Sequence, residues 1–260
     1  MKIFNWKDIL DSPQNDAMKA FFAQGCGISV GSFDGLHKGH RVLVKTLVNQ
    51  CSKNQLLPGI VTFTRPLPSI KHSVDYAGDV STLQQRLNLF ERLGVAFVIV
   101  VDFDEDFAGR SGTEFFELLV RQCNMSLISE GVDFRCGYKG ATDTQALKYF
   151  CQQNNIKAFF VSPVYYKPGT DEEERISSSY IRMMIKKGFL ATVEELLERK
   201  YELDFTESEV YDGMIDRKSV LQVLPPDGIY HCKNEAGEAV RVEIDGKIIK
   251  FDITSKSILF

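Results

Sequence analysis

Short hydrophobic runs alternate with amphipathic stretches over most of the chain. The apolar runs predict strands, and stretches with apolar residues at helical spacing predict helices. We expect strands at Ile28–Gly31, Ile60–Phe63, Val95–Val101, Met125–Ser129 and Lys157–Ser162. Between them we expect helices at Arg41–Ser52 and Thr144–Asn154. Two more helices are expected to begin with capping boxes, one at Ser81–Gln84 that leads to Gly94 and one at Ser111–Glu114 that leads through Val120. This alternation indicates an α/β fold with a doubly wound parallel sheet.

The pattern changes near Gly188. Helices are expected at Ile181–Lys187 and Val193–Arg199, and beyond them apolar residues recur at every second position. The expected strands are Gly228–Cys232, Val240–Ile244 and Ile248–Ile253, with a hairpin turn at Asp245-Gly246. We therefore expect two domains, an α/β domain over residues 1–188 and a small antiparallel β domain over residues 189–260.

Composition places the chain among ordinary globular proteins. Of its 260 residues, 44% are hydrophobic and 25% are charged, with a formal net charge of −4. This charge argues against a general nucleic-acid binder, and no apolar run approaches the roughly 18 residues that span a bilayer. Acidic residues in the first 20 positions (Asp8, Asp11 and Asp16) argue against a signal peptide, so we expect a cytoplasmic protein. The six scattered cysteines are expected to be free thiols.

The segment from Gly31 to His40 is the richest candidate site. It lies where a strand leads into a helix, and a parallel sheet usually binds its ligand at such a turn. His37 and His40 are three residues apart, so both rings can lie beside the free N–H groups of the first helical turn and bind an anion. The candidate phosphate-binding residues of the turn are Gly31, Ser32, Phe33, Asp34, Gly35 and Gly39. The alternative is a glycine-rich turn whose histidines are solvated or cap the helix.

A second candidate lies at the start of the helix that includes Ile181. The hydroxyls of Ser177, Ser178 and Ser179 precede this helix, and Arg175 and Arg182 flank them. Hydroxyls, free N–H groups and guanidiniums together suit the oxygens of a phosphate. The alternative is a serine-rich helix cap with surface arginines.

Two further loops follow predicted strands. Gly131–Gly137 contains Asp133, which can accept hydrogen bonds from a ribose or a base, and Phe134. Phe63 precedes a proline-containing loop and offers an aromatic face that can stack on a planar heterocycle; the alternative is core packing. Because parallel strands end at one edge of a sheet, we expect the candidate loops to converge there. The chain lacks a Walker A motif and a G-x-G-x-x-G motif, so we expect attack on a nucleoside triphosphate held by histidines, arginines and helix N-termini.

These motifs resemble the adenylyltransferase module of the prokaryotic bifunctional riboflavin kinase/FAD synthetases. That family has a G-x-F-D-G-x-H-x-G-H turn, matched by Gly31 to His40, and an I-S-S-T-x-I-R motif, matched by Ile176 to Arg182 with Ser179 in place of Thr. Its G-x-D/N-F-x-F-G loop is matched by Gly131 to Gly137, with Cys136 in place of Phe, and its T-F-x-P-x-P loop is partly matched at Thr62–Pro66. The resemblance runs from about residue 28 to residue 201.

The resemblance implies a Rossmann-like nucleotidylyltransferase of the HxGH superfamily that transfers AMP from ATP to FMN, with Mg²⁺. His37 and His40 match the pair that binds the ATP phosphates and stabilises the transition state, and Asp133 matches a position associated with substrate placement. Arg175, Ser178 and Arg182 match polar residues of the phosphate loop, and we expect Arg182 also to act in catalysis with the two histidines. The implied partners are therefore the small molecules ATP and FMN, with neither nucleic acid nor membrane.

The tail departs from the family pattern. Pro225–Tyr230 is similar to the P-x-x-G-V-Y strand entry of the riboflavin kinase domain, but the G-x-P-T-A-N motif of that domain is missing. The tail thus resembles a reduced kinase barrel, and no riboflavin kinase activity is expected from it. Two alternatives stay open: another nucleotidylyltransferase of the HxGH superfamily, and a flavin-nucleotide sensor without catalysis.

Overall fold

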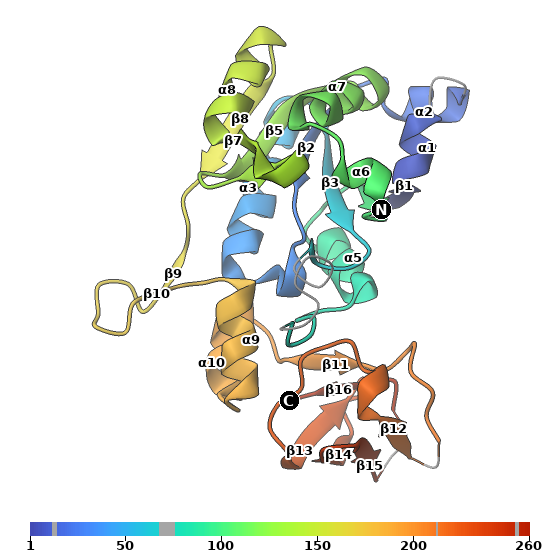
Figure 1. The fold of residues 1–260 in the computed structure, drawn as a ribbon, viewed down its shortest axis with the longest axis vertical. Helices are drawn as coiled ribbons and strands as arrows, with labels where there is room; N and C mark the ends of the chain where they lie inside the picture. Colours follow the sequence, from blue (N-terminus) through green and yellow to red (C-terminus); the bar gives the residue numbers. More distant parts are fainter. Residues whose placement is uncertain (12–14, 68–75, 212, 253–254) are drawn as a thin grey trace. The chain divides into compact units, whose positions relative to one another are not determined.

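The computed structural model describes residues 1–11, 15–67, 76–211, 213–252 and 255–260. The chain divides into two compact units (Figure 1). The first unit comprises Met1–Phe33, Gly39–Ile70 and Leu87–Pro163, and the second comprises Asp34–Lys38, Lys71–Arg86 and Val164–Phe260. The glycine- and histidine-containing turn therefore contributes to both units, with His37 in the second and His40 in the first. Helix α9 (Ser178–Lys186), which precedes the predicted boundary at residue 188, also belongs to the second unit.

The first unit is built on a parallel sheet, which confirms the predicted fold class. Its six strands lie in the order β1 (Lys2–Asn5), β4 (Phe97–Val101), β3 (Leu57–Phe63), β2 (Cys26–Val30), β5 (Met125–Gly131) and β8 (Lys157–Val161). All neighbouring strands are parallel, so β2, β3 and β5 end at the same edge. Strands β2 and β4 are buried along their whole length, and in β4 this matches the continuous apolar run of the sequence.

The strands are connected through helices, most of which were predicted. They are α1 (Trp6–Leu10), α2 (Asp16–Phe21), α3 (Lys38–Lys53), α5 (Leu83–Arg92), α6 (Glu105–Ala108), α7 (Gly112–Cys123) and α8 (Thr144–Gln153). The predicted capping box at Ser111 is present: its hydroxyl accepts a hydrogen bond from the N–H of Glu114, and Glu114 bonds back. The box predicted from Ser81 to Gln84 is wrong by one residue, because Thr82 and Gln85 form the reciprocal pair.

The C-terminal part of the second unit contains helices α9 and α10 and an antiparallel sheet, and the sheet is drawn in orange to dark red in Figure 1. Helix α10 (Leu190–Leu197) follows α9. The strand order is β11 (Glu202–Asp204), β16 (Ser257–Leu259), β13 (Gly228–Asn234), β14 (Ala239–Ile244), β15 (Ile248–Phe251) and β12 (Met214–Asp216). Strands β13 to β15 confirm the predicted alternation, although β15 ends at Phe251 and residue 253 lies outside the described part. Strands β11, β12 and β16 were not predicted.

Each unit has its own hydrophobic core. In the first, Trp6, Phe22, Phe97 and Phe116 are among the buried side chains. In the second, Val80 joins residues of α9, α10 and the antiparallel sheet, such as Ile181, Leu196 and Val242. Within the described residues, no helix is long and apolar enough to cross a membrane.

Two small hairpins complete the fold. Strand β6 (Arg135–Cys136) pairs with β7 (Thr142–Asp143), and β9 (Tyr165–Tyr166) pairs with β10 (Glu174–Arg175). The β9–β10 hairpin separates β8 from the serine-rich start of α9, so this candidate loop does not directly follow a strand of the parallel sheet.

Candidate functional site

The backbone before His37 is bent into an unusual conformation. Asp34–Leu36 forms one turn of 3-10 helix, and α3 begins at Lys38. Phe33, Gly35 and Leu36 have φ angles of 48°, 77° and 39°. Bulky residues rarely adopt positive φ, so this conformation is strained and needs support from surrounding groups.

Three side chains from the second unit bind the backbone of this turn. The N–H of Gly35 donates to the hydroxyl of Ser81 at 2.8 Å, and the carbonyl of Gly35 accepts from the Arg199 guanidinium at 2.7 Å. The hydroxyl of Ser178, in the first turn of α9, donates to the carbonyl of Asp34 at 2.8 Å. The polar backbone groups of the turn are therefore held by partners far away in sequence.

The Asp34 carboxylate is a second support. It is 2% exposed and accepts hydrogen bonds from the N–H groups of Val80 and Ser81, both at 3.0 Å. It also forms an ion pair with Arg182. Burial raises the pKa of Asp34, while Arg182 and the two N–H groups act in the opposite direction. The structure thus places Asp34, a predicted phosphate-binding residue, within the protein's own hydrogen-bond network.

Arg182 is buried, and its guanidinium is engaged by the protein. Besides the ion pair with Asp34, Nε donates to the carbonyl of Gly78 at 2.8 Å and Nη2 donates to the hydroxyl of Tyr76 at 3.0 Å. The guanidinium carbon also lies 4.8 Å from the centre of the Tyr76 ring. This geometry links α9 to Asp34–His37, here named the histidine turn. Direct contact between Arg182 and a phosphate stays a prediction.

His37 lies in a buried and positively charged environment. The side chain is 5% exposed, and its pKa is lowered to about 3, first by burial and then by the guanidiniums of Arg199 and Arg175. The imidazole is therefore neutral at neutral pH and can donate one ring N–H. Two nearby arginines and the N-terminus of α3 favour an anion at such a position. Arg175, predicted to bind phosphate, is exposed and electrostatically close to His37.

The rest of the turn belongs to the first unit. Gly39 and His40 lie in the first turn of α3, and the His40 ring packs edge-on against Phe33 with centroids 5.3 Å apart. Phe33 is buried and also contacts Phe90. The hydroxyl of Ser32 accepts a hydrogen bond from the N–H of Leu67 at 3.2 Å. Gly31 follows β2 directly and is half-buried.

The serine-rich segment forms the predicted helix start. The hydroxyl of Ser177 accepts a hydrogen bond from the N–H of Tyr180 at 3.2 Å, which caps α9. Ser178 bonds the histidine turn, whereas Ser179 is exposed. The helix cap of the alternative interpretation is present, but Arg182 is buried and so only Arg175 is a surface arginine. A helix cap also leaves free N–H groups for an anion, and phosphate binding here stays a prediction.

The three candidate flavin residues lie in the first unit in different environments. Phe63 is 5% exposed and packs against Phe103 and Phe107, which agrees with core packing. Phe134 is half-buried with its ring 6.3 Å from that of Phe116, and Asp133 is exposed. Contact of these three residues with a flavin stays a prediction.

One buried acid at the sheet edge was missed. Glu130, near the end of β5, is 1% exposed and accepts a hydrogen bond from the N–H of Val30 at 2.6 Å. Burial raises the pKa of Glu130 well above its usual value, and the N–H of Val30 acts in the opposite direction. Its side chain joins the ends of β2 and β5 directly before Gly31. No motif pointed to it, although an acid in an apolar strand pattern is itself a signal.

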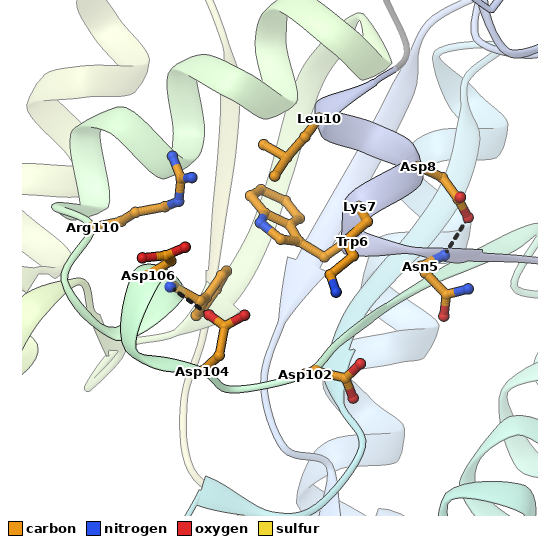
Figure 2. A pocket seen from close by; sticks show the side chains of 10 residues that line it. Asn5, Trp6, Lys7, Asp8, Leu10, Asp102, Asp104, Asp106 and Arg110 are labelled. Carbon is orange, nitrogen blue, oxygen red and sulfur yellow. Dashed lines mark hydrogen bonds between the residues drawn. The ribbon is translucent and has the colours of Figure 1, made fainter.

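A pocket in the first unit, seen from close by in Figure 2, is lined by none of the predicted site residues. Its volume is about 410 Å³. Trp6 and four aspartates (Asp8, Asp102, Asp104 and Asp106) line it, with Lys7 and Arg110. Asp8 and Asp104 accept hydrogen bonds from the N–H groups at the starts of α1 and α6. Half of its acidic side chains therefore stabilise helix ends.

No cluster of three or more histidine, cysteine or acidic side chains suited to a metal ion is present among the described residues. Mg²⁺ usually binds through few carboxylates together with the phosphates of a nucleotide. Binding of Mg²⁺ by this chain stays a prediction.

A family model described as FAD synthetase matches residues 20–180. The bifunctional riboflavin kinase/FMN adenylyltransferase of Escherichia coli K12 is 29% identical over 181 residues, which cover 67% of this chain and 54% of that protein. The FAD synthetase of Listeria monocytogenes is 26% identical over 204 residues, covering 78% of this chain and 79% of that protein. This chain thus spans about half the length of the bifunctional relatives and most of the length of the Listeria protein.

The overall fold also occurs in a crystal structure from Streptococcus pneumoniae described as a macrolide-efflux protein. The two chains superpose with a TM-score of 0.71, at 21% sequence identity and with 90% of each chain covered. At this identity, the likeness shows the fold alone.

Proposed function

We propose, from the premise that this chain belongs to the FAD synthetase family, that it is an FMN adenylyltransferase forming FAD and pyrophosphate from FMN and ATP. The observation that carries the proposal is the environment of His37. A neutral, buried imidazole lies next to the N-terminus of α3, with Arg175 and Arg199 close enough to lower its pKa. A polyphosphate is the anion that this combination suits best.

In the proposed reaction, a phosphate oxygen of FMN attacks the α-phosphorus of ATP in line, and pyrophosphate leaves. No protein nucleophile is required, so the chain would act by positioning and by stabilising developing negative charge. His37 would donate its ring N–H to a phosphate oxygen, and His40 would act from the first turn of α3. Ser177, Ser179 and the N–H groups at the start of α9 would bind the remaining phosphate oxygens, with Arg175. Asp133 and Phe134 are our candidates for flavin contacts.

Mg²⁺ enters the proposal as part of the substrate, bound to the triphosphate. It would neutralise charge on the phosphate oxygens and on the departing pyrophosphate. We assign it no protein ligand.

We further propose that this chain has no riboflavin kinase activity. The supporting observation is the missing Pro-Thr motif in the tail, which forms a small antiparallel sheet with its own core. Soluble substrates and the absence of a membrane-spanning helix among the described residues support a cytoplasmic location.

The experiment that tests the function is a chromatographic assay with Mg²⁺ and ATP. FMN, riboflavin, nicotinate mononucleotide, pantetheine phosphate and glycerol phosphate are offered in parallel reactions. We expect FAD and pyrophosphate from FMN alone. FMN or FAD from riboflavin would contradict the absence of kinase activity. Product from another phosphate acceptor would favour a different nucleotidylyltransferase, and flavin binding without pyrophosphate release would favour a sensor.

A further inference from the structure

In the second unit, hydrogen bonds through one short backbone segment connect the C-terminal region, here called the tail, to the histidine turn. Residues 76–82, here named the bracing segment, lie between them in the hydrogen-bond network. The N–H of Val80 donates to Asp34, and the carbonyl of Val80 accepts from the side-chain amide of Gln222 at 3.1 Å. The backbone N–H of Val80 thus bonds to the histidine turn, and its carbonyl bonds to the tail.

The contact between the bracing segment and the tail is a backbone pairing. The N–H of Asp79 donates to the carbonyl of Leu221, and the N–H of Val223 donates to the carbonyl of Asp79, both at 2.8 Å. Gly78 permits this approach, because a Cβ added there would lie 2.6 Å from the nitrogen of Val223. The φ of Gly78 is +116°, which also favours glycine.

Gln222 is the residue that connects these groups. It is 3% exposed, and its amide oxygen accepts from the N–H of Asp204 at 2.8 Å. Its amide nitrogen donates to the carbonyls of Val80 and Glu202 and to the side chain of Gln85. Both ends of the side chain are thus hydrogen-bonded inside the protein, which fits a structural link better than a ligand contact.

We propose that the C-terminal antiparallel sheet is a positioning element for adenylyl transfer, with Gln222 as the positioning residue that holds the bracing segment against the Asp34 carboxylate. This inference rests on the proposed function and gives the tail a role other than kinase chemistry. Gln222 of the tail holds Val80 through a hydrogen bond to its carbonyl. The N–H groups of Val80 and Ser81 in turn hold the Asp34 carboxylate. Together with the ion pair to Arg182, they hold the strained turn that ends at His37. Displacing a catalytic group by about 1 Å can lower a rate by about a hundredfold.

The test compares two variants of the full chain that weaken the same sheet in different ways. Gln222→Ala removes the link to the bracing segment. Val242→Ala removes packing from β14, where Val242 is fully buried, and leaves the link in place. Both are assayed well below their melting temperatures. We expect kcat/KM for FAD formation to fall about 10- to 100-fold in Q222A and less than threefold in V242A.

A second readout does not depend on activity. The imidazole of His37 is titrated by NMR in the wild type, Q222A and V242A, with its resonance assigned through His37→Gln. We expect V242A to keep the wild-type titration and Q222A to move it toward that of an exposed histidine, because the turn loosens. If wild-type protein forms no FAD, the proposed function fails, and the titration still decides whether the tail positions His37.

Two results would overturn the proposal that Gln222 positions the histidine turn. Equal losses of kcat/KM in Q222A and V242A, in proportion to their melting temperatures, would assign Gln222 to general stability. An unchanged rate and an unchanged His37 titration in Q222A would show that the tail does not position the turn.

Discussion

The parallel sheet of the first unit and the histidine turn of the second unit are held in opposite ways. Sheet strands such as β4 are buried on both faces, and their backbone groups bond to adjacent strands. The turn Asp34–Leu36 has strained backbone, and its polar groups bond to side chains from residues 81, 178 and 199. We expect substitutions in the apolar packing of the sheet to lower stability without changing the activity of the folded protein. A strained polar turn is expected to lose function together with stability.

The largest effect should follow Asp34→Ala. This change leaves the buried Arg182 guanidinium without its carboxylate and two buried N–H groups without an acceptor. We expect a loss of about 3 to 5 kcal/mol in the free energy of unfolding, together with a loss of FAD formation of about a hundredfold or more. Urea denaturation and steady-state kinetics measure the two losses.

The matched sheet variant is Ile99→Ala in β4, which removes fully buried apolar volume. It should cost about 2 to 5 kcal/mol and leave kcat/KM near the wild-type value under folding conditions. Similar kinetic losses in both variants would remove the distinction between the two regions.

Two glycines sharpen the comparison. Gly35 in the turn has φ +77°, and a Cβ there would lie 2.7 Å from Val80 Cγ1. Gly59 in β3 would place a Cβ 2.0 Å from the ring of Phe97. We expect Gly35→Ala and Gly59→Ala each to cost about 1 to 3 kcal/mol, with a kinetic loss of about tenfold in G35A alone. A kinetic loss in G59A at full folding would contradict this prediction.

The acid response of the turn gives a third test. The folded-state pKa of His37, about 3, is below that of the unfolded chain, about 6.5. The unfolded state therefore binds a proton first, so this group lowers stability as pH falls from about 6.5 toward 3. Between pH 7 and pH 5, His37→Gln should lose about 2 kcal/mol less stability than the wild type. Urea unfolding at pH 7 and pH 5 measures this difference in stability. His231→Gln, at an exposed histidine, is the control for losing a histidine. An identical pH dependence in H37Q and wild type would contradict the buried neutral state.

The smallest effects should come from two helix caps. Ser177 caps α9 in the second unit and Ser111 caps α7 in the first. Each change to Ala should cost about 1 kcal/mol of stability. S177A should also raise the KM for ATP a few-fold, whereas S111A should not. Equal KM values in the two variants would leave Ser177 as a cap without a role in binding.

The sheet was predictable because its signals are local. Val95–Val101 shows its burial as an unbroken apolar run, and the capping box at Ser111 lies within four residues. The missed strand β1 has the opposite character. It is a short edge strand, with Ile3 54% exposed, and no apolar run marks it.

The histidine turn was predictable only in part. Its glycines and histidines form a local motif, which indicated the site. The side chains that hold the turn form no local motif. Ser81 was interpreted as a helix cap, and the roles of Arg199 and Gln222 depend on contacts with residues more than 100 positions away. Spacing within a sequence carries no information on such pairings. Arg182 is an example, because no motif indicated that its guanidinium would bind Asp34, Gly78 and Tyr76.

The most direct measurement for the account is kcat/KM for FAD formation from FMN and ATP in His37→Ala and wild-type protein at pH 7.5. If His37 stabilises the transition state, we predict measurable FAD synthesis by the wild type and a loss of about a hundredfold in H37A, equivalent to about 3 kcal/mol. Near-normal kcat/KM in H37A would contradict the central claim that adenylyl transfer takes place at this turn.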